Sequence, residues 1–303
     1  MEALKLRCPA TAANLGAGFD VFGLALKEPY DLLEVSVRES GVEIMAEGYP
    51  VPTEPERNTG GYVALRMIED FSLKKGVRII MVKRIKPGSG LGSSAATASG
   101  VAYALNRLFN LKLDLNTLVE YAALGETVSA GVAHADNVAP ALYGGFTIIA
   151  SRKPLKVLKF NPPPMGVVLV VPETVKASTR RAREVLPKMV PLESAVKNVG
   201  YASILAAGMA LGNLSLVKMG MNDCIVEPAR AEAGILKGFK AFKEAGLEIG
   251  AGVSASGAGP TVIGIIEQEK VDVLYRVFSR VCASLGLNCT IYKTEPGNGV
   301  GEL

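Results

Sequence analysis

Alternation of apolar and polar positions predicts strands near the start of the chain. Residues 4–8 alternate and predict a first strand. Residues 32–37 and 42–46 follow with the same pattern, and we expect them to be antiparallel neighbours. Residues 77–83 are rich in apolar and β-branched side chains and predict a further strand. The N-terminal part of the chain is therefore expected to form a sheet.

Helical spacing appears between and after these strands. Val63, Met67 and Phe71 share one face of a helix predicted over 58–71, with Asn58 suited to cap its start. Residues 95–109 have the strongest amphipathic pattern. The remaining pattern of the N-terminal half predicts a helix over 115–124, a loop over 131–145, and strands at 146–150 and 155–160.

A run of three prolines at 162–164 is the clearest break in composition. Strands and helices mix on both sides of it without the strict βαβ alternation of a parallel sheet. We therefore predict two α+β domains, residues 1–161 and 162–303, with no internal repeat. In the second, the pattern predicts strands at 167–171, 261–266 and 288–293, and helices near 180–186, 193–211, 235–245 and 271–285.

Composition and charge exclude several classes of protein. The formal net charge is +4, from 33 basic and 29 acidic side chains without a basic run, so neither nucleic acid nor an anionic membrane is an expected partner. The longest uncharged stretches contain Gly, Ser or Asn and do not predict a membrane span. The four cysteines lack CxxC or zinc spacing and favour free thiols. The N-terminus lacks the apolar region of a signal peptide, so we expect a cytoplasmic protein.

Two compositional features narrow the chemistry further. The chain has a single histidine, His134, which excludes sites built from several histidines and leaves only one residue around which a Ser-His or Cys-His triad could form. It also has 33 glycines among 303 residues, about 11% against an average of about 7%. Part of this excess lies in three segments of small residues.

The first segment, residues 86–96, joins a predicted strand to a predicted helix. Its glycines let backbone N–H groups turn toward a ligand, and Ser93 and Ser94 begin the helix, where a phosphate is favoured. No lysine precedes these serines as in a Walker A loop, and Ser93 takes the place of the third glycine of a dinucleotide fingerprint. A tight turn with a serine cap is the alternative interpretation.

The other two segments are residues 250–261, which lead into a predicted strand, and residues 9–20, which follow the first strand. We interpret 250–261 as a loop pressed against the active site, with close packing as the alternative. In residues 9–20 only Asn14 and Asp20 are strongly polar, and both are also ordinary turn residues. Each segment alone is a modest signal, and the three together are much more specific.

The three segments resemble, in order and spacing, the motifs of the GHMP small-molecule kinases: PATAANLGAGFD at 9–20, PGSGLGSSAA at 87–96 and SGAGPT at 256–261. Within that superfamily the chain is most similar to the homoserine kinases, through residues 131–140 and 226–230. It departs from their pattern at Ala12, where serine is usual. The resemblance covers the whole chain and implies a ribosomal-protein-S5-domain-2-like N-terminal domain and a ferredoxin-like C-terminal domain.

The resemblance also implies ATP and Mg²⁺ as cofactors and L-homoserine as substrate, in threonine biosynthesis. Ser94 and Glu126 would hold the metal. Arg183 and Arg230 would bind the substrate carboxylate, and Asp20 its ammonium group. Asn14, His134, Asn137 and Gly257 complete the implied substrate site. The implied ATP-binding residues are Pro87, Gly88, Ser89, Gly90, Leu91, Gly92, Ser93, Ser94, Ala95 and Ala96.

The related mevalonate and galactose kinases carry an aspartate where this chain has Asn137. An amide cannot accept a proton, so we expect catalysis through positioning and Mg²⁺, with Asn137, Ser94 and Glu126 as the catalytic residues. A general base at His134 is an alternative. Two other functions stay open: a mevalonate or shikimate kinase of the same superfamily, and a non-catalytic ligand-binding relative. The resemblance is also compatible with a homodimer.

Overall fold

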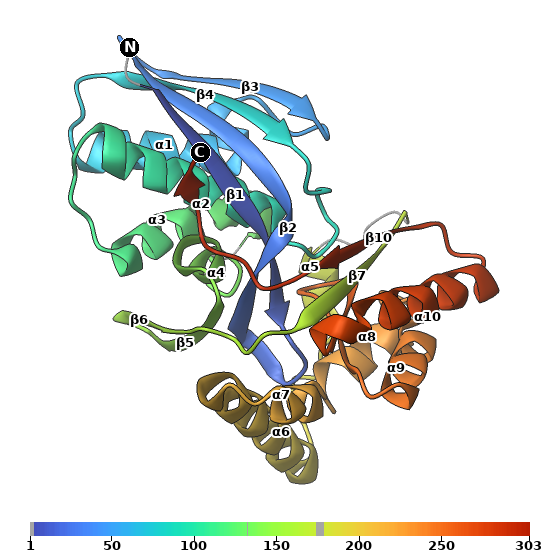
Figure 1. Ribbon diagram of the computed structural model, residues 1–303. Helices are drawn as coiled ribbons and strands as arrows, with labels where there is room; N and C mark the ends of the chain where they lie inside the picture. The colour runs from blue at the N-terminus through green and yellow to red at the C-terminus, as the bar shows by residue number, and fades with distance from the viewer. Residues whose placement is uncertain (1–2, 132, 174–178) are drawn as a thin grey trace.

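The computed structural model describes residues 3–131, 133–173 and 179–303, which form two sheets flanked by helices (Figure 1). This confirms the expected mixed fold of strands and helices. The first sheet contains β1 (Ala3–Asn14), β2 (Gly18–Arg38), β3 (Val42–Gly48), β4 (Gly76–Lys83), β5 (Phe146–Arg152), β6 (Leu155–Phe160) and β11 (Gly301–Glu302). The second contains β7 (Gly166–Pro172), β8 (Gly252–Ala255), β9 (Val262–Ile266) and β10 (Cys289–Thr294).

The first sheet has the strand order β11-β1-β2-β4-β3, and β5 and β6 extend it from the other part of β2. The prediction that residues 32–37 and 42–46 are antiparallel neighbours is wrong. Strand β4 lies between β2 and β3, and it pairs with β3 in parallel. The cause is helix α1 (Thr59–Asp70), which connects β3 to β4 and returns the chain to the same end of the sheet.

Helices cover one face of this sheet (Figure 1). Asn58 caps α1, because its side-chain Oδ1 accepts the backbone N–H groups of Gly60 and Gly61. The predicted loop over 131–145 is partly wrong: six of its residues form a short helix between Asn137 and the left-handed Gly144. Val132 of that stretch lies outside the described residues. The other helices here are α2 (Ser93–Leu108), α3 (Leu115–Ala130), α4 (Val138–Tyr143) and the 3₁₀ turn Pro55–Arg57.

Strand β7 in the second sheet is apolar along its whole length because both of its faces are buried. Val168 and Val170 point to a core formed with α9 and α10 around Phe242 and Phe278. The alternate residues of β7 belong to the larger core of the first sheet. The second sheet is antiparallel, with order β10-β7-β9-β8, so it separates the two cores and holds the two halves together.

The remaining helices follow β7 in the chain. Helices α6 and α7 pack on each other as a hairpin that projects from the body at the bottom of Figure 1. Arg230 lies in helix α8. The bounds are α5 (Thr179–Glu184), α6 (Leu192–Leu211), α7 (Leu214–Gly220), α8 (Val226–Glu232), α9 (Phe239–Glu248), α10 (Val271–Ser284) and the 3₁₀ turn Gln268–Lys270. The division at 161/162 stays a prediction, and β11 returns the C-terminus to the first sheet.

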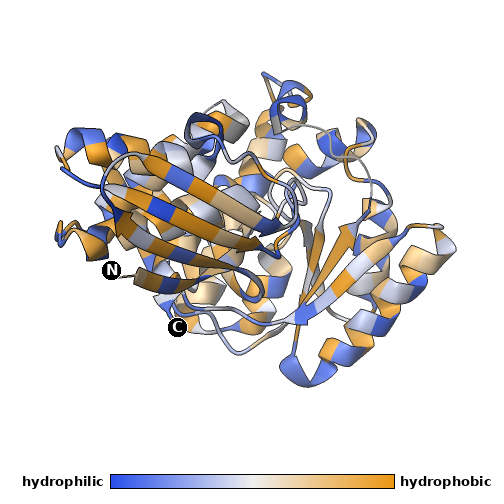
Figure 2. Ribbon diagram, turned by 90° about the horizontal axis from the view of Figure 1, so that it is seen from above, coloured by the Kyte–Doolittle hydropathy of each residue, from blue (hydrophilic) through white to orange (hydrophobic). Residues whose placement is uncertain are grey.

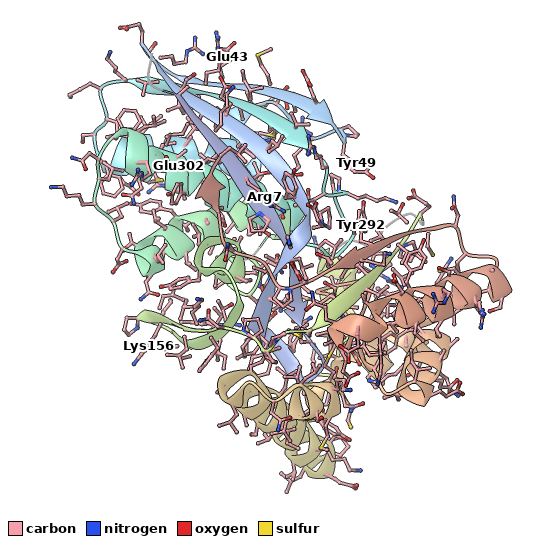
Figure 3. The ribbon with its side chains drawn as sticks, viewed as in Figure 1. Arg7, Glu43, Tyr49, Lys156, Tyr292 and Glu302 are labelled. Carbon is pink, nitrogen blue, oxygen red and sulfur yellow. The ribbon has the colours of Figure 1, made fainter. Side chains whose placement is uncertain are left out.

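Polar and apolar positions sort between surface and core as the strand periodicity requires. Apolar colour dominates the strands in Figure 2, whereas Arg7 and Glu43 stand on the outer face of the first sheet in Figure 3. Cys8 and Cys282 are buried, Cys224 and Cys289 are half-buried, and all four are free thiols, as expected. In the described part of the chain, no helix is long and apolar enough to cross a membrane.

Candidate active site

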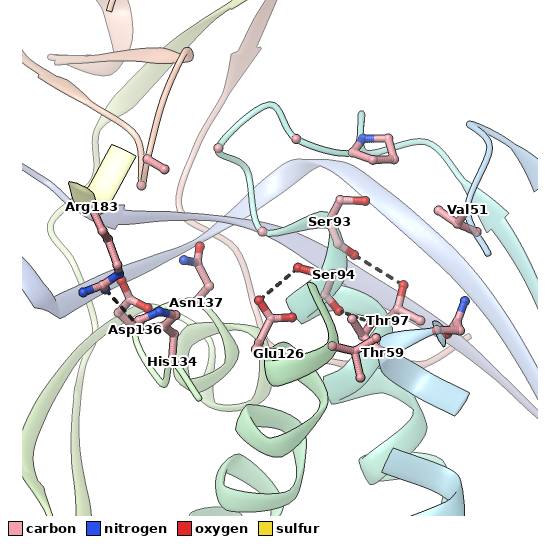
Figure 4. Close-up of a pocket in the computed structure, with 18 of the residues that line it drawn as sticks. Val51, Thr59, Ser93, Ser94, Thr97, Glu126, His134, Asp136, Asn137 and Arg183 are labelled. Atoms are coloured by element: carbon pink, nitrogen blue, oxygen red, sulfur yellow. Dashed lines mark hydrogen bonds between the residues drawn. The ribbon is translucent and has the colours of Figure 1, made fainter. Parts of the chain in front are cut away.

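A cavity of about 700 Å³ lies where the two halves meet. Its walls come from the first sheet and its helices, from α5 and α8, and from the loop that follows β8. Figure 4 shows its two ends: Ser93, Ser94, Thr97 and Glu126 gather around the start of α2, and His134, Asp136 and Arg183 gather at the opposite end. Asn137 stands between the two groups.

The glycine-rich loop before α2 has a backbone that requires glycine. Gly88, Gly90 and Gly92 have φ values of 76°, 89° and 64°. A Cβ on Gly90 would lie 2.5 Å from the carbonyl oxygen of Ser256, and the Ser256 hydroxyl donates to the Gly90 carbonyl at 2.7 Å. Ser93 and Ser94, the first two residues of α2, line the cavity, and the free N–H groups of a helix start favour a phosphate. Two of the three small-residue segments are thus in direct contact.

The ten residues implied for ATP binding divide into two groups. Pro87, Gly88, Gly90, Gly92, Ser93 and Ser94 line the cavity. The side chains of Ser89, Leu91, Ala95 and Ala96 are buried beneath it. Ser89 fixes the loop instead: its hydroxyl donates to the Lys86 carbonyl at 2.8 Å, and its carbonyl accepts the N–H of Thr261 at 3.1 Å.

Ser94 and Glu126 meet across the helices α2 and α3. The Ser94 hydroxyl donates to Oε2 of Glu126 at 2.9 Å, and Glu126 is buried at the cavity wall. A hydroxyl and a carboxylate are hard oxygen donors, and Mg²⁺ binds to few protein oxygens when phosphates supply the rest. The pair therefore fits the implied metal. Among the described residues, no cluster of three or more His, Cys, Asp or Glu could hold a metal ion.

A buried ion pair supports the start of α2 from below. Lys83 Nζ donates to the Asp31 carboxylate, to the carbonyl of Ser93 at 2.9 Å and to the hydroxyl of Thr97 at 2.9 Å. The other oxygen of Asp31 accepts the N–H groups that open the loop, at Arg84 and Ile85. Sequence reasoning missed this pair, because a lysine at the end of a strand carries no local signal of burial. It fixes the strand, the loop and the helix in one position.

At the other end of the cavity, Arg183 forms an ion pair with Asp20 at 2.5 Å. Arg183 also contacts Nδ1 of His134 at 3.2 Å. A guanidinium can only donate, so Nδ1 accepts and the proton of a neutral His134 lies on Nε2. Burial, reinforced by the charge of Arg183, lowers the pKa of His134 and keeps the ring neutral. Nε2 of His134 and Nε of Arg183 are buried donors without a partner among the described residues.

Arg230 is buried, and its side chain links the loop after β8 to helix α5. Its guanidinium donates to the carbonyl oxygens of Gly257 at 2.8 Å and Ala182 at 3.1 Å. Asn14 donates to the same Gly257 carbonyl at 2.8 Å, and its Oδ1 accepts the N–H of Asp20 at 3.1 Å. Asn14 and Gly257 therefore shape the site as well as line it. Burial, followed by the neighbouring charge of Arg183, lowers the pKa of Arg230.

Sequence reasoning missed several further residues of the cavity. Asp136 is buried there, and burial together with the charge of Asp20 raises its pKa to about 6. The ring of Phe19 lies under both guanidinium groups, 5.1 Å from Arg183 and 5.4 Å from Arg230. Near the start of α1, the cavity is walled by Val51, Pro52, Glu56, Arg57, Asn58 and Thr59. Residues of these types are common in loops, so the sequence alone does not indicate that they line a ligand-binding cavity.

Comparisons with known proteins show which family and which solved structures the chain is similar to. Residues 59–145 match the family model of the GHMP kinases N terminal domain. The chain is 44% identical over 303 residues to a homoserine kinase of Methanococcus maripaludis, covering 99% of this chain and 98% of the relative. It superposes on a crystal structure of homoserine kinase from Cytophaga hutchinsonii with a TM-score of 0.92 and 35% identity, covering 100% and 98%. An L. major mevalonate kinase in complex with R-mevalonate, at TM-score 0.74 and 16% identity, shares the fold over 97% and 96%.

Proposed function

The chain belongs to the homoserine kinases within the GHMP kinases, and on this premise we propose that it transfers the γ-phosphoryl group of ATP to the side-chain hydroxyl of L-homoserine. The product is O-phospho-L-homoserine, an intermediate of threonine biosynthesis. The site residues support this proposal independently of the family, because one end of the cavity suits ATP and the other suits L-homoserine.

The paired charges of Asp20 and Arg183 are the observation that supports an amino-acid acceptor. They lie together at the end of the cavity away from the phosphate loop, with Arg230 and Asp136 beside them. An amino acid carries both a carboxylate and an ammonium group. It can insert between Arg183 and Asp20 and replace each half of their ion pair with one of its own charges, so no buried charge is left alone. Mevalonate and galactose have no ammonium group to complete this exchange.

The nucleotide end is built from backbone and hard oxygen donors. The loop over 88–94 and the start of α2 would bind the ATP phosphates through N–H groups, and the wall formed by Val51, Pro52 and Asn58 would face the nucleoside. Ser94 and Glu126 would hold Mg²⁺. Bound there, the metal would neutralise charge on the β- and γ-phosphates.

Catalysis would proceed without a dedicated strong base. Phosphoryl transfer has a loose transition state in which the attacking hydroxyl loses its proton late, so alignment and charge stabilisation carry most of the rate. Asn137, between the two ends of the cavity, would hold the reacting hydroxyl in line with the γ-phosphorus. His134, with its proton on Nε2, would donate a hydrogen bond to the bound amino acid and would not act as the base.

An ADP-release assay across several acceptors tests this function. We expect turnover with homoserine, and background turnover with mevalonate, shikimate, galactose and no acceptor. Turnover of mevalonate or shikimate without homoserine would assign the chain to another kinase of the superfamily. Thermal stabilisation by nucleotide with no turnover of any acceptor would support a non-catalytic ligand-binding relative.

We also propose that the chain forms a homodimer through the outer face of α6. Leu192, Val196, Val199 and Leu211 are exposed on this helix by 79%, 63%, 67% and 74%. From 200 to 210 the exposed positions are glycine, serine or alanine, and no charged residue occurs from 198 to 217. A helix that is apolar on its outer face as well as its inner face is expected to bury that outer face against another protein surface. Opposite charges occur only at its first turns, in the pair Glu193–Lys197.

A second copy of the chain fits this face best. In an antiparallel, two-fold pair, each charged first turn lies beside the partner's uncharged last turn, so like charges stay apart and opposite helix-dipole ends meet. Light scattering during gel filtration should give twice the chain mass for wild type. The double variant Val196→Glu/Val199→Lys should elute as a monomer, and the surface variant Met45→Glu, on β3, as a dimer. A monomeric wild type at micromolar concentration would contradict the dimer.

A further inference from the structure

Thr11 lies behind the cavity wall at the point where the two ends of the site meet. It is in the last part of β1 and is fully buried. Its backbone N–H donates to the carbonyl oxygen of Leu91 in the phosphate loop at 3.1 Å. Its hydroxyl donates to Oδ1 of Asn137 at 2.9 Å. One residue therefore holds both the nucleotide loop and the side chain that faces the reacting hydroxyl.

The phosphate loop is shaped around this hydroxyl. A Cβ on Gly92 would lie 2.1 Å from Oγ1 of Thr11 and 3.1 Å from Oδ1 of Asn137. Gly92 is the left-handed N-cap residue immediately before α2, at φ 64°. The Thr11–Asn137 hydrogen bond thus packs directly against the turn whose N–H groups would bind phosphate. The distance between Asn137 and that turn is fixed by Thr11.

The direction of the hydrogen bond decides what Asn137 offers to a substrate. An amide has one acceptor oxygen and one donor nitrogen at opposite ends of the same plane. Because the Thr11 hydroxyl donates to Oδ1, the Nδ2 group is turned the other way, toward the cavity. No hydrogen bond donated by Nδ2 is found among the described residues. The amide therefore presents N–H donors where the hydroxyl and the γ-phosphoryl oxygens would meet, and donors stabilise the negative charge that develops there.

We propose that Thr11 is a positioning residue for phosphoryl transfer: its hydroxyl sets the orientation of the Asn137 amide and fixes that amide against the phosphate loop. The proposal rests on the proposed kinase function. The Thr11 hydroxyl acts through Asn137. It therefore affects the rate of phosphoryl transfer and leaves the binding of either substrate nearly unchanged. It also explains why this short buried stretch of β1 carries a hydroxyl among alanines.

A mutant cycle between Thr11 and Asn137 tests the proposal. Thr11→Val keeps the shape of the side chain and removes the hydroxyl, whereas Thr11→Ser keeps the hydroxyl. We expect Thr11→Val to lower kcat about 10- to 30-fold, with KM for ATP and for homoserine changed less than about threefold. Thr11→Ser should stay within about threefold of wild type. In an Asn137→Ala background, adding Thr11→Val should lower kcat by less than about a further twofold.

Two results would overturn the proposal. One is a Thr11→Val enzyme with the kcat of wild type. The other is an equal loss from Thr11→Val with and without Asn137, which would assign Thr11 to packing. Thermal melting within about 3 °C of wild type separates lost alignment from lost folding. The acceptor assay on the wild-type enzyme is carried out first. If the proposed function is wrong, that assay shows no turnover of homoserine. If only the role of Thr11 is wrong, wild type turns over homoserine and the error shows in the Thr11 variants alone.

Discussion

The two ends of the cavity are built in different ways. At the nucleotide end, the proposed phosphate cradle is one continuous stretch of chain, a glycine-rich turn running into α2, and it would work mainly through backbone N–H groups. The acceptor end is assembled from charged side chains on β2, on the segment before α4, on α5 and on α8. Phosphate is common to all kinases and needs only a general anion cradle, whereas an amino acid must be recognised by its own charges. Specificity is therefore expected to reside in the side chains of the acceptor end.

Removing the carboxylate at the nucleotide end should have the largest effect. We expect Glu126→Gln to lower kcat about 10²- to 10³-fold and to raise the Mg²⁺ concentration needed for half-maximal rate, because the amide keeps the shape but loses the charge. Steady-state rates over a Mg²⁺ titration measure both. The matched control is Glu120→Gln, exposed on the same helix. A Glu126→Gln enzyme with an unchanged Mg²⁺ requirement would remove Glu126 from the metal site.

Changing the acceptor end should leave the nucleotide end intact. Arg183→Gln removes one of the two guanidinium groups and leaves Asp20 with only its longer ion pair to Arg152, at 3.5 Å. We expect KM for homoserine to rise about 30- to 300-fold while KM for ATP changes less than about threefold. Initial-rate kinetics with each substrate varied in turn give both constants. Arg180→Gln, on the exposed side of α5, should match wild type. Equal increases in both KM values would refute the division into two ends.

The same contrast explains how much of the site the sequence could predict. Residues 86–96 are contiguous, and glycine and serine between a strand and a helix have a direct physical meaning, so the loop and its helix were predictable. Helix α1 and its Asn58 cap were predictable for the same local reason. The family resemblance supplied the acceptor residues, whose roles stay predictions. Asp136, Phe19 and Lys83 were missed, because their burial depends on which distant segments pack against them.

Errors in the predicted fold have related causes. The pairing of β3 was wrong because an alternating pattern identifies a strand and not its neighbour, and α1 carries the chain to a parallel partner. Helix α4 was missed because its six residues include Pro140 and are too few to show helical periodicity.

His134 tests whether the acceptor end holds a base or only donors. His134→Gln keeps a side-chain N–H donor and removes the titrating ring, so we expect kcat/KM for homoserine to fall only about 3- to 10-fold. Because burial lowers the pKa of His134 below its ordinary value, a neutral ring is favoured near neutral pH, and the pH profile should keep its shape in the variant. Rates between pH 5.5 and 8.5 for both enzymes decide this. A loss above about 10²-fold, with a limb of the profile removed, would make His134 the general base.

Asp136 gives the smallest predicted effect, which is one of stability. Burial and the charge of Asp20 raise its pKa from 3.8 to about 6 in the folded chain. A raised folded-state pKa means that Asp136 favours folding below about pH 4, where it is protonated in both states. That contribution is lost as pH rises through about 6, because the folded chain must then hold a buried carboxylate.

The variant Asp136→Asn removes the cost of holding this buried carboxylate. The free energy of unfolding should therefore rise relative to wild type, by about 1–2 kcal/mol more at pH 8 than at pH 4.5. Chemical denaturation at the two pH values measures it, with Glu120→Gln as a surface control. A gain independent of pH would mean that the carboxylate at 136 is not strained by burial, and that the acceptor end can hold two carboxylates without cost before an ammonium group arrives.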